Sequence, residues 1–275
     1  CAVEGVVTVD RKSSVTVDLL RLGVMDTEAS LAHHQRITET IGADPSRLTG
    51  WEHHLEMSCD PDLALDTLAD LSQRSPQLVV DLLGDEDSAC RLVRLLGASS
   101  ELGRHLVAHP DDLAEIAHDP VRRSRDEIRD DLLEVVGAHE DGEFLVAERP
   151  TGPAADRLRL ANRRHLVRIA SRDVGADDPT EVVEDIAGEL ADLADAVVAA
   201  ALALTRADCP DHADARLAVI AMGKCGAQEL NYISDVDVVH VAEPAREDVS
   251  AARAVDIATK LAASVARICS AHSGA

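Results

Sequence analysis

Asp235 and Asp237, two carboxylates two residues apart, open a β-branched run and are the residues of this chain best suited to chemistry. Side chains alternate along a strand, so both acids would leave the same face. Carboxylates this close repel each other unless a cation neutralises them. Mg²⁺ or Mn²⁺, which prefer oxygen ligands, would fit there. The spacing therefore indicates a metal site that would also hold the phosphate oxygens of a nucleotide.

The residues before this pair suit a phosphate group. Gly223 and Gly226 frame a turn that frees backbone N–H groups, and the Ser234 hydroxyl adds a donor. Lys224 would add a positive charge, although a solvent-facing lysine explains it equally well. A D-x-D pair alone is common at strand edges, and its combination with the glycine turn and the serine favours a nucleotide site. Cys225 is interpreted as a packed small residue, because no histidine stands at a recognisable spacing from it.

Strands must position these groups. The runs at 216–222 and 235–242 are rich in β-branched residues and predict two strands around the glycine turn, with a short helix through residues 228–230. Val236 and Val238 would face a helical layer. The fold class predicted for the whole chain is α+β and mostly α-helical, with a small mixed sheet.

The chain divides into three regions by pattern. Residues 1–17 are poorly patterned and predict a poorly ordered lead-in, 18–205 form a predicted helical region with a long helix near its end, and 206–275 hold the strands. Asp60-Pro61 and Asp178-Pro179 each supply an N-cap followed by proline, which predicts helix starts.

A loop is expected over residues 139–159, before a basic helix. Five arginines lie on that helix, either as a solvated face or as an anion-binding face: Arg157, Arg159, Arg163, Arg164 and Arg168.

Composition excludes several classes of protein. Acidic residues outnumber basic ones 51 to 27, giving a net charge of -24, which argues against a nucleic acid partner. Neither a signal peptide nor an apolar run of membrane length is apparent, so we expect no membrane association and a cytoplasmic protein. Six scattered cysteines without a CxxC pair suggest free thiols. The first residue is Cys, and we expect a piece of a longer protein.

Two histidine pairs, His33-His34 and His53-His54, invite a metal interpretation. Adjacent side chains on a helix point in different directions, so the sequence argues against metal binding at either pair.

The stretch IAMGKCGAQELNYISDVDVVHVAEP, residues 220–244, resembles the nucleotidyltransferase signature of the glutamine synthetase adenylyltransferase and adenylyl-removing enzymes. LLGASSELGRHLVAHPDDL, residues 95–113, and the segments at 19–26 and 60–72 are similar to the helices before the first catalytic motif of that family. The resemblance covers roughly residue 18 to the end and places this chain in the N-terminal half, which is associated with adenylyl removal.

The resemblance implies a polymerase-β-like nucleotidyltransferase domain, of which 206–275 would be the beginning. Asp235 and Asp237 match its metal-binding acids, and Gly223, Gly226 and Ser234 match its phosphate-contacting part. The implied reaction is phosphorolysis: inorganic phosphate releases AMP from a tyrosine of glutamine synthetase as ADP, and the reverse chemistry uses ATP. Glutamine synthetase and a PII-type nitrogen signalling protein are the implied partners.

Two departures from the family pattern stand out. Ala227 occupies a position where a second glycine often sits, and the later V-D-x-x-L-R-P segment with a third acid is not found in this chain. We therefore expect an incomplete metal site and an inactive chain when it is alone. Two alternatives stay open: a non-catalytic helical interaction module, and a nucleotidyltransferase that acts on another acceptor.

Overall fold

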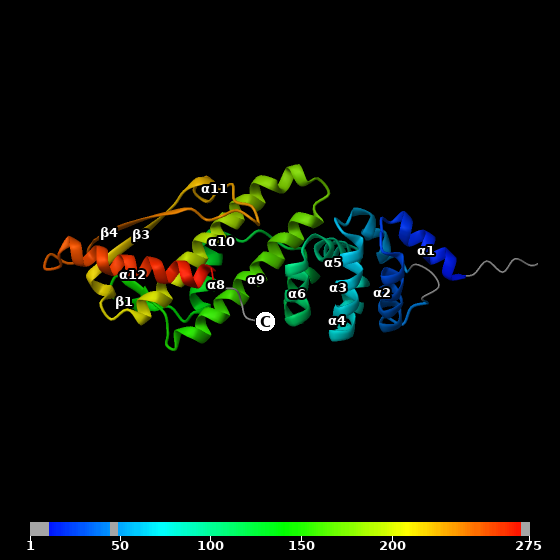
Figure 1. Cartoon of the computed structure of the whole chain (residues 1–275), viewed down its shortest axis with the longest axis horizontal. Helices are drawn as coiled ribbons and strands as arrows, with labels where there is room; N and C mark the ends of the chain where they lie inside the picture. Colours follow the sequence, from blue (N-terminus) through cyan, green and yellow to red (C-terminus); the bar gives the residue numbers. More distant parts are fainter. Residues whose placement is uncertain (1–10, 45–48, 271–275) are drawn as a thin grey trace, which may run out of the picture. The chain divides into compact units, whose positions relative to one another are not determined.

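The computed structural model describes residues 11–44 and 49–270, coloured along the chain in Figure 1. The chain forms two compact units. Unit 1 comprises residues 1–120 and 170–177, and unit 2 comprises 121–169 and 178–275. No helix among the described residues combines the length and apolar character needed to cross a membrane.

Unit 1 is a series of short helices, as the sequence predicts. Asp60 starts the third helix as expected, because its carboxylate accepts from the Leu63 N–H at 3.0 Å and Pro61 follows it. The helices in chain order are α1 (Arg11–Arg21), α2 (Thr27–Thr40), η1 (Trp51–Met57), α3 (Pro61–Arg74), α4 (Pro76–Leu83), α5 (Glu86–Ala98), α6 (Ser100–Ala108), η2 (Pro110–Leu113) and α7 (Ala114–Ala117).

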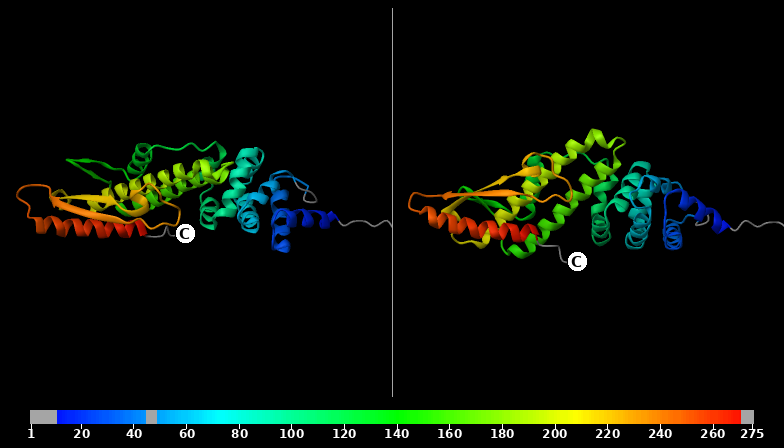
Figure 2. Two further views of the ribbon diagram at one scale, coloured as in Figure 1. Left: turned by 90° about the horizontal axis from the view of Figure 1, so that it is seen from above. Right: turned by 45° about the horizontal axis from the view of Figure 1, so that its top comes forward.

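The predicted lead-in overlaps a helix, since α1 begins at Arg11, and residues 1–10 lie outside the described part of the chain. In unit 1, α3 contacts α2 and α5, which lie beside it in both views of Figure 2. Leu65, Leu68 and Leu71 on α3 are fully or almost fully buried. Aliphatic packing of this kind forms the core of the unit.

The two histidine pairs behave differently. His33 and His34 diverge as expected: His33 approaches Asp66 at 3.4 Å, and the buried His34 binds Glu52 at 2.9 Å. The rings of His53 and His54 instead converge, with centroids 3.8 Å apart, so the expected divergence is wrong there. The reason is local, because the His53 ring turns back to bond the carbonyl of Gly50.

Unit 2 combines long helices with two short hairpins. Its elements are α8 (Arg125–Val135), β1 (His139–Asp141), β2 (Phe144–Val146), α9 (Thr151–Gly175), α10 (Pro179–Asp208), η3 (His212–Asp214), β3 (Ala215–Ala221), α11 (Gly223–Gly226), β4 (Val238–Pro244) and α12 (Ala251–Ser270). The last residues of α9, from Ala170, belong to unit 1. Helix α10 starts at Pro179 behind its cap Asp178, as predicted.

The predicted mostly helical α+β class is confirmed, with two differences in the strands. β1 pairs with β2, and β3 with β4, both antiparallel, so the described residues form no mixed sheet. Part of the expected loop at 139–159 is the β1–β2 hairpin. Its two-residue turn places Gly142 at φ +64°, a conformation that glycine adopts readily.

The core of unit 2 supports the second hairpin. α10 packs against α8 and α12, and α12 contacts both β3 and β4. Figure 2 shows α12, in red, running along the two strands. Leu217 on β3 is buried together with Ile257 and Leu261 of α12. The strand pair is therefore anchored on one face by helices.

Two of the arginines of α9 form ion pairs within unit 2. Arg168 is buried and pairs with the buried Glu189 of α10 at 2.7 Å, while Arg164 reaches Asp131 at 3.0 Å. For Arg168 neither interpretation of this helix holds, because its side chain is neither solvated nor available to an outside anion, whereas Arg157 is exposed. The role of Arg168 is to hold α9 against α10.

Candidate active site

The β3–β4 pair frames the predicted site. Ala221, the last residue of β3, pairs with Val238, the first residue of β4. One further bond extends the pairing, since the Met222 N–H donates to the Asp237 carbonyl at 2.8 Å. The predicted start of this strand at 235 is therefore too early. After Met222 the segment that follows β3 turns away into α11. The backbone hydrogen bonds between the two strands end at this point.

Two glycines are required at this turn for separate reasons. Gly223 has φ +54°, and a Cβ there would lie 3.3 Å from the Asp237 Oδ2. A Cβ on Gly226 would lie 2.5 Å from the carbonyl oxygen of Ala221, closer than real contacts allow. The turn therefore brings its backbone up to the strand ends. Its helix is Gly223–Gly226, earlier than the expected 228–230.

Ser234 and Lys224 lie beside each other on this turn. The Lys224 ammonium donates to the Ser234 hydroxyl at 3.5 Å, and that hydroxyl donates to the Asn231 side-chain oxygen at 2.8 Å. The same Asn231 oxygen accepts from the Ile233 N–H at 3.1 Å. Asn231 thus fixes the loop that presents Ser234. The sequence signal for it is an asparagine two residues before an amide that it can bond, an Asx turn.

Asp235 and Asp237 are both exposed in the segment before β4. Their carboxylate oxygens are the type of ligand that Mg²⁺ and Mn²⁺ prefer, so the chemistry of the two residues suits such an ion. No third His, Cys, Asp or Glu joins them to make a three-ligand group in the part of the chain that the structure describes. The structure brings Gly223 next to Asp237 and Lys224 next to Ser234.

The opposite face of the hairpin looks onto helices. Val236 and Val238 line a cavity of about 220 Å³ together with residues of α8 and α10. Arg125 and Asp195 form an ion pair at 2.6 Å in its wall. The predicted alternation is therefore confirmed for the two valines, which face the helical layer.

Cys225 is buried behind the glycine turn, and burial raises the pKa of its thiol. A raised pKa keeps the sulfur protonated and unreactive. This environment agrees with the interpretation of a packed residue. The other cysteines among the described residues, at 59, 90, 209 and 269, are free thiols as well.

Comparison with known proteins gives a consistent result. The family model described as glutamate-ammonia ligase adenylyltransferase matches residues 89–275. Relatives from several bacteria carry the name bifunctional glutamine synthetase adenylyltransferase/adenylyl-removing enzyme. The one from Cutibacterium acnes is 77% identical over 266 residues, covering 97% of this chain and 27% of the relative.

Two further relatives are more distant. The protein from Streptomyces coelicolor is 41% identical over 278 residues, which cover 96% of this chain and 25% of the relative. The protein from Bifidobacterium longum subsp. infantis is 36% identical over 264 residues, which cover 92% of this chain and 24% of the relative. The chain thus spans about a quarter of the length of the curated relatives it matches.

Proposed function

The chain belongs to the glutamate-ammonia ligase adenylyltransferase family, and we propose that its unit 2 carries a nucleotidyl-transfer site that removes adenylyl groups from glutamine synthetase. Removal is proposed over addition because of the resemblance of this segment to the N-terminal half of such enzymes. The relatives' names contain both activities, so addition of AMP is the second candidate.

One observation carries the proposal. The glycine turn is held against the acid that follows it: Met222 N–H bonds the Asp237 carbonyl at 2.8 Å, and a Cβ on Gly223 would lie only 3.3 Å from the Asp237 carboxylate. Donors suited to phosphate and a carboxylate suited to a cation are thereby kept side by side. This pairing is what a metal-assisted reaction at phosphorus needs.

Each residue has a proposed role. Asp235 and Asp237 would hold Mg²⁺ or Mn²⁺, and such an ion, when bound, neutralises charge on the attacking and leaving oxygens. Ser234, the backbone of the glycine turn and Lys224 would bind the phosphate oxygens. Lys224 is exposed and bonded to a neutral hydroxyl, so it can turn to an anion without breaking an ion pair.

The proposed reaction balances as a phosphorolysis. An oxygen of inorganic phosphate attacks the adenylyl phosphorus, the bond from that phosphorus to the tyrosine oxygen breaks, and ADP leaves. The tyrosine oxygen takes up the proton that the phosphate gives up. In-line displacement of this kind depends on positioning and charge stabilisation more than on covalent help from the protein.

The test measures ADP formed from adenylylated glutamine synthetase and phosphate in the presence of Mg²⁺ or Mn²⁺. It uses the complete product of the gene that contains this sequence, because the described residues supply two carboxylates and we expect little activity from this chain alone. Asp235→Asn and Asp237→Asn should each lower the rate by at least about 100-fold. Glu243→Gln on β4, an exposed acid paired with Arg216 at 3.4 Å, is the matched control and should retain the rate.

Each alternative has its own outcome. If both aspartate variants retain ADP formation and AMP incorporation alike, the catalytic roles are rejected and a helical interaction module is favoured. Incorporation of AMP from ATP into unmodified glutamine synthetase, lost in the same two variants while ADP formation is retained, would assign addition to this site instead. Activity only on other acceptors would reject glutamine synthetase as the substrate. Regulation by a PII-type protein is part of the proposal through the family resemblance alone.

A further inference from the structure

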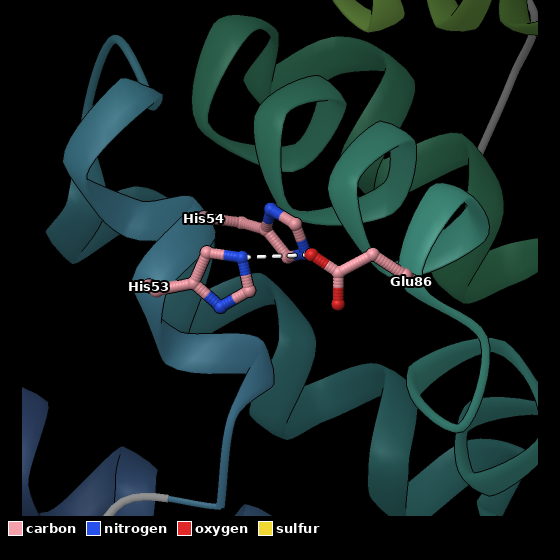
Figure 3. A group of neighbouring side chains, drawn as sticks. All are labelled: His53, His54 and Glu86. Atoms are coloured by element: carbon pink, nitrogen blue, oxygen red, sulfur yellow. Dashed lines mark hydrogen bonds and ion pairs between the residues drawn. The ribbon is translucent and has the colours of Figure 1, made fainter.

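A second group of potential ligands lies in unit 1, far along the sequence from the acids of β4. His53 and His54 of η1 and Glu86, the first residue of α5, point toward one another (Figure 3). The His53 Nε2 lies 2.9 Å and the His54 Nε2 3.6 Å from the same Glu86 Oε1. One ligand atom from each residue falls within 4.8 Å of the others. Residues 33 positions apart thus converge on one point.

A backbone carbonyl determines which nitrogen of the His53 ring carries a proton. The Nδ1 of His53 bonds the carbonyl oxygen of Gly50, and a carbonyl only accepts, so this nitrogen carries the proton. In the neutral ring the lone pair then sits on Nε2 and points at Glu86. A lone pair facing a carboxylate oxygen is repelled unless a proton or a metal cation lies between them. A backbone carbonyl on the far nitrogen is also the usual partner of a metal-binding histidine.

His54 contributes a buried nitrogen without a hydrogen bond. Its side chain is 6% exposed, and its Nε2 has no hydrogen-bond partner although it faces Glu86. A buried polar atom without a partner costs free energy in a native protein. A cation placed between His54 and Glu86 would remove that cost.

The loop that carries this arrangement is held in place. The buried Glu52 carboxylate accepts from the Gly50 N–H at 2.9 Å and from the Thr49 N–H at 2.9 Å. Glu52 thereby sets the position of the Gly50 carbonyl that orients His53. The ligand set is therefore organised by groups other than the ligands themselves.

We propose that His53, His54 and Glu86 form a binding site for a divalent transition metal ion of the zinc class. Two ligand atoms at about 2.1 Å from a tetrahedral zinc ion lie about 3.4 Å apart. The two distances to the Glu86 oxygen, 2.9 and 3.6 Å, bracket that value. Two imidazoles with one carboxylate select zinc-class ions over Mg²⁺, and a water would complete the fourth position.

This site is separate from the proposed catalytic one. It belongs to unit 1, whereas Asp235 and Asp237 belong to unit 2 and offer only oxygen donors. A bound ion would connect η1 to the first turn of α5, because its ligands come from both. It would therefore stabilise unit 1 by binding the folded state alone.

The experiment titrates Zn²⁺ into the chain under reducing conditions, in competition with a chromogenic zinc indicator. The wild-type chain should bind one equivalent that millimolar Mg²⁺ does not displace. His53→Ala and Glu86→Gln should each weaken this binding by at least about 10-fold. Both side chains are largely exposed, 55% and 73%, so these substitutions leave the packing of unit 1 in place.

Three further variants act as controls. His118→Ala removes an exposed histidine of unit 1, Cys59→Ser removes an exposed thiol, and Asp237→Asn alters the other site, and all three should bind as wild type does. Co²⁺ should give visible ligand-field bands that the His53 and Glu86 variants lose. Unchanged affinity in both of those variants, binding lost in Cys59→Ser, or no saturable equivalent at all would each overturn the proposal.

Discussion

The glycine turn of unit 2 leads to a prediction about stability: replacing glycine by alanine should have opposite effects at two positions. Gly226→Ala should destabilise the protein, and Gly152→Ala should stabilise it. The Cβ at position 226 would lie 2.5 Å from the backbone oxygen of Ala221, whereas a Cβ at 152, near the start of α9, would have no atom within 4 Å. The two substitutions therefore share their effect on the unfolded chain and differ in the native contact.

The magnitude follows from that contact. The carbonyl belongs to backbone paired in β3, so it cannot rotate away, and relief requires a shift of roughly half an ångström between turn and strand. Overpacking of this kind costs about 1–3 kcal/mol. Replacing glycine by alanine gains about 0.4–1 kcal/mol through the unfolded state. We expect a net loss of about 1–2 kcal/mol for Gly226→Ala and a gain of up to about 1 kcal/mol for Gly152→Ala.

Urea unfolding followed by far-ultraviolet circular dichroism measures both changes, with equal slopes expected in the transition. Hydrogen exchange adds a local measurement, since the Met222 amide bonded to Asp237 should exchange faster in Gly226→Ala only. Equal signs for the two variants, or a Gly226→Ala protein with unchanged Met222 protection, would refute the close packing of the turn on β3. The structural link between the glycines and Asp237 would then fail as well.

Three other perturbations test separate parts of the structure. Arg168→Met should cost about 3–5 kcal/mol by leaving the buried Glu189 carboxylate without its ion pair, and the double variant Arg168→Met/Glu189→Leu should recover most of that loss in urea unfolding. Burial lowers the pKa of His165 from 6.5 to about 4, so between these values the unfolded state binds a proton that the folded state does not. The free energy of unfolding should therefore fall between pH 7 and pH 5, by up to about 1.4 kcal/mol per pH unit below pH 6.5. His165→Gln should flatten this dependence, and urea unfolding midpoints measured at several pH values would show the difference. Asp62→Ala should cost about 1–3 kcal/mol, because the carboxylate accepts from Met25 N–H, Asp26 N–H and the Ser30 hydroxyl at 2.6–3.1 Å; a thermal midpoint equal to that of the wild type would contradict this.

The sequence predicts correctly those features that depend on neighbouring residues in the chain, such as helix starts and the alternation of side chains along a strand. Asp60-Pro61 and Asp178-Pro179 predict helix starts correctly, because the cap carboxylate and the proline act within one turn. The alternation of side chains likewise places Val236 and Val238 toward the helices correctly.

Features that depend on a partner segment could not be predicted in the same way. The strand expected from 235 begins at Val238, because the length of a ladder is set by where β3 turns away. The β1–β2 hairpin has strands of three residues, too short for a period of two to be recognised. The convergence of His53 with His54 depends on the Gly50 carbonyl and on a glutamate of another helix.

Charge explains why Lys224 matters in a chain of net charge -24. Phosphate groups would be repelled by such a surface unless local cations oppose it. Arg168 is committed to Glu189 and Arg125 to Asp195, so turning either toward a phosphate would cost an ion pair. Lys224 donates instead to the neutral hydroxyl of Ser234. An ammonium held by a hydroxyl can move to a phosphate with a net gain of charge pairing, so we propose Lys224 as the cation that meets the phosphate at this site.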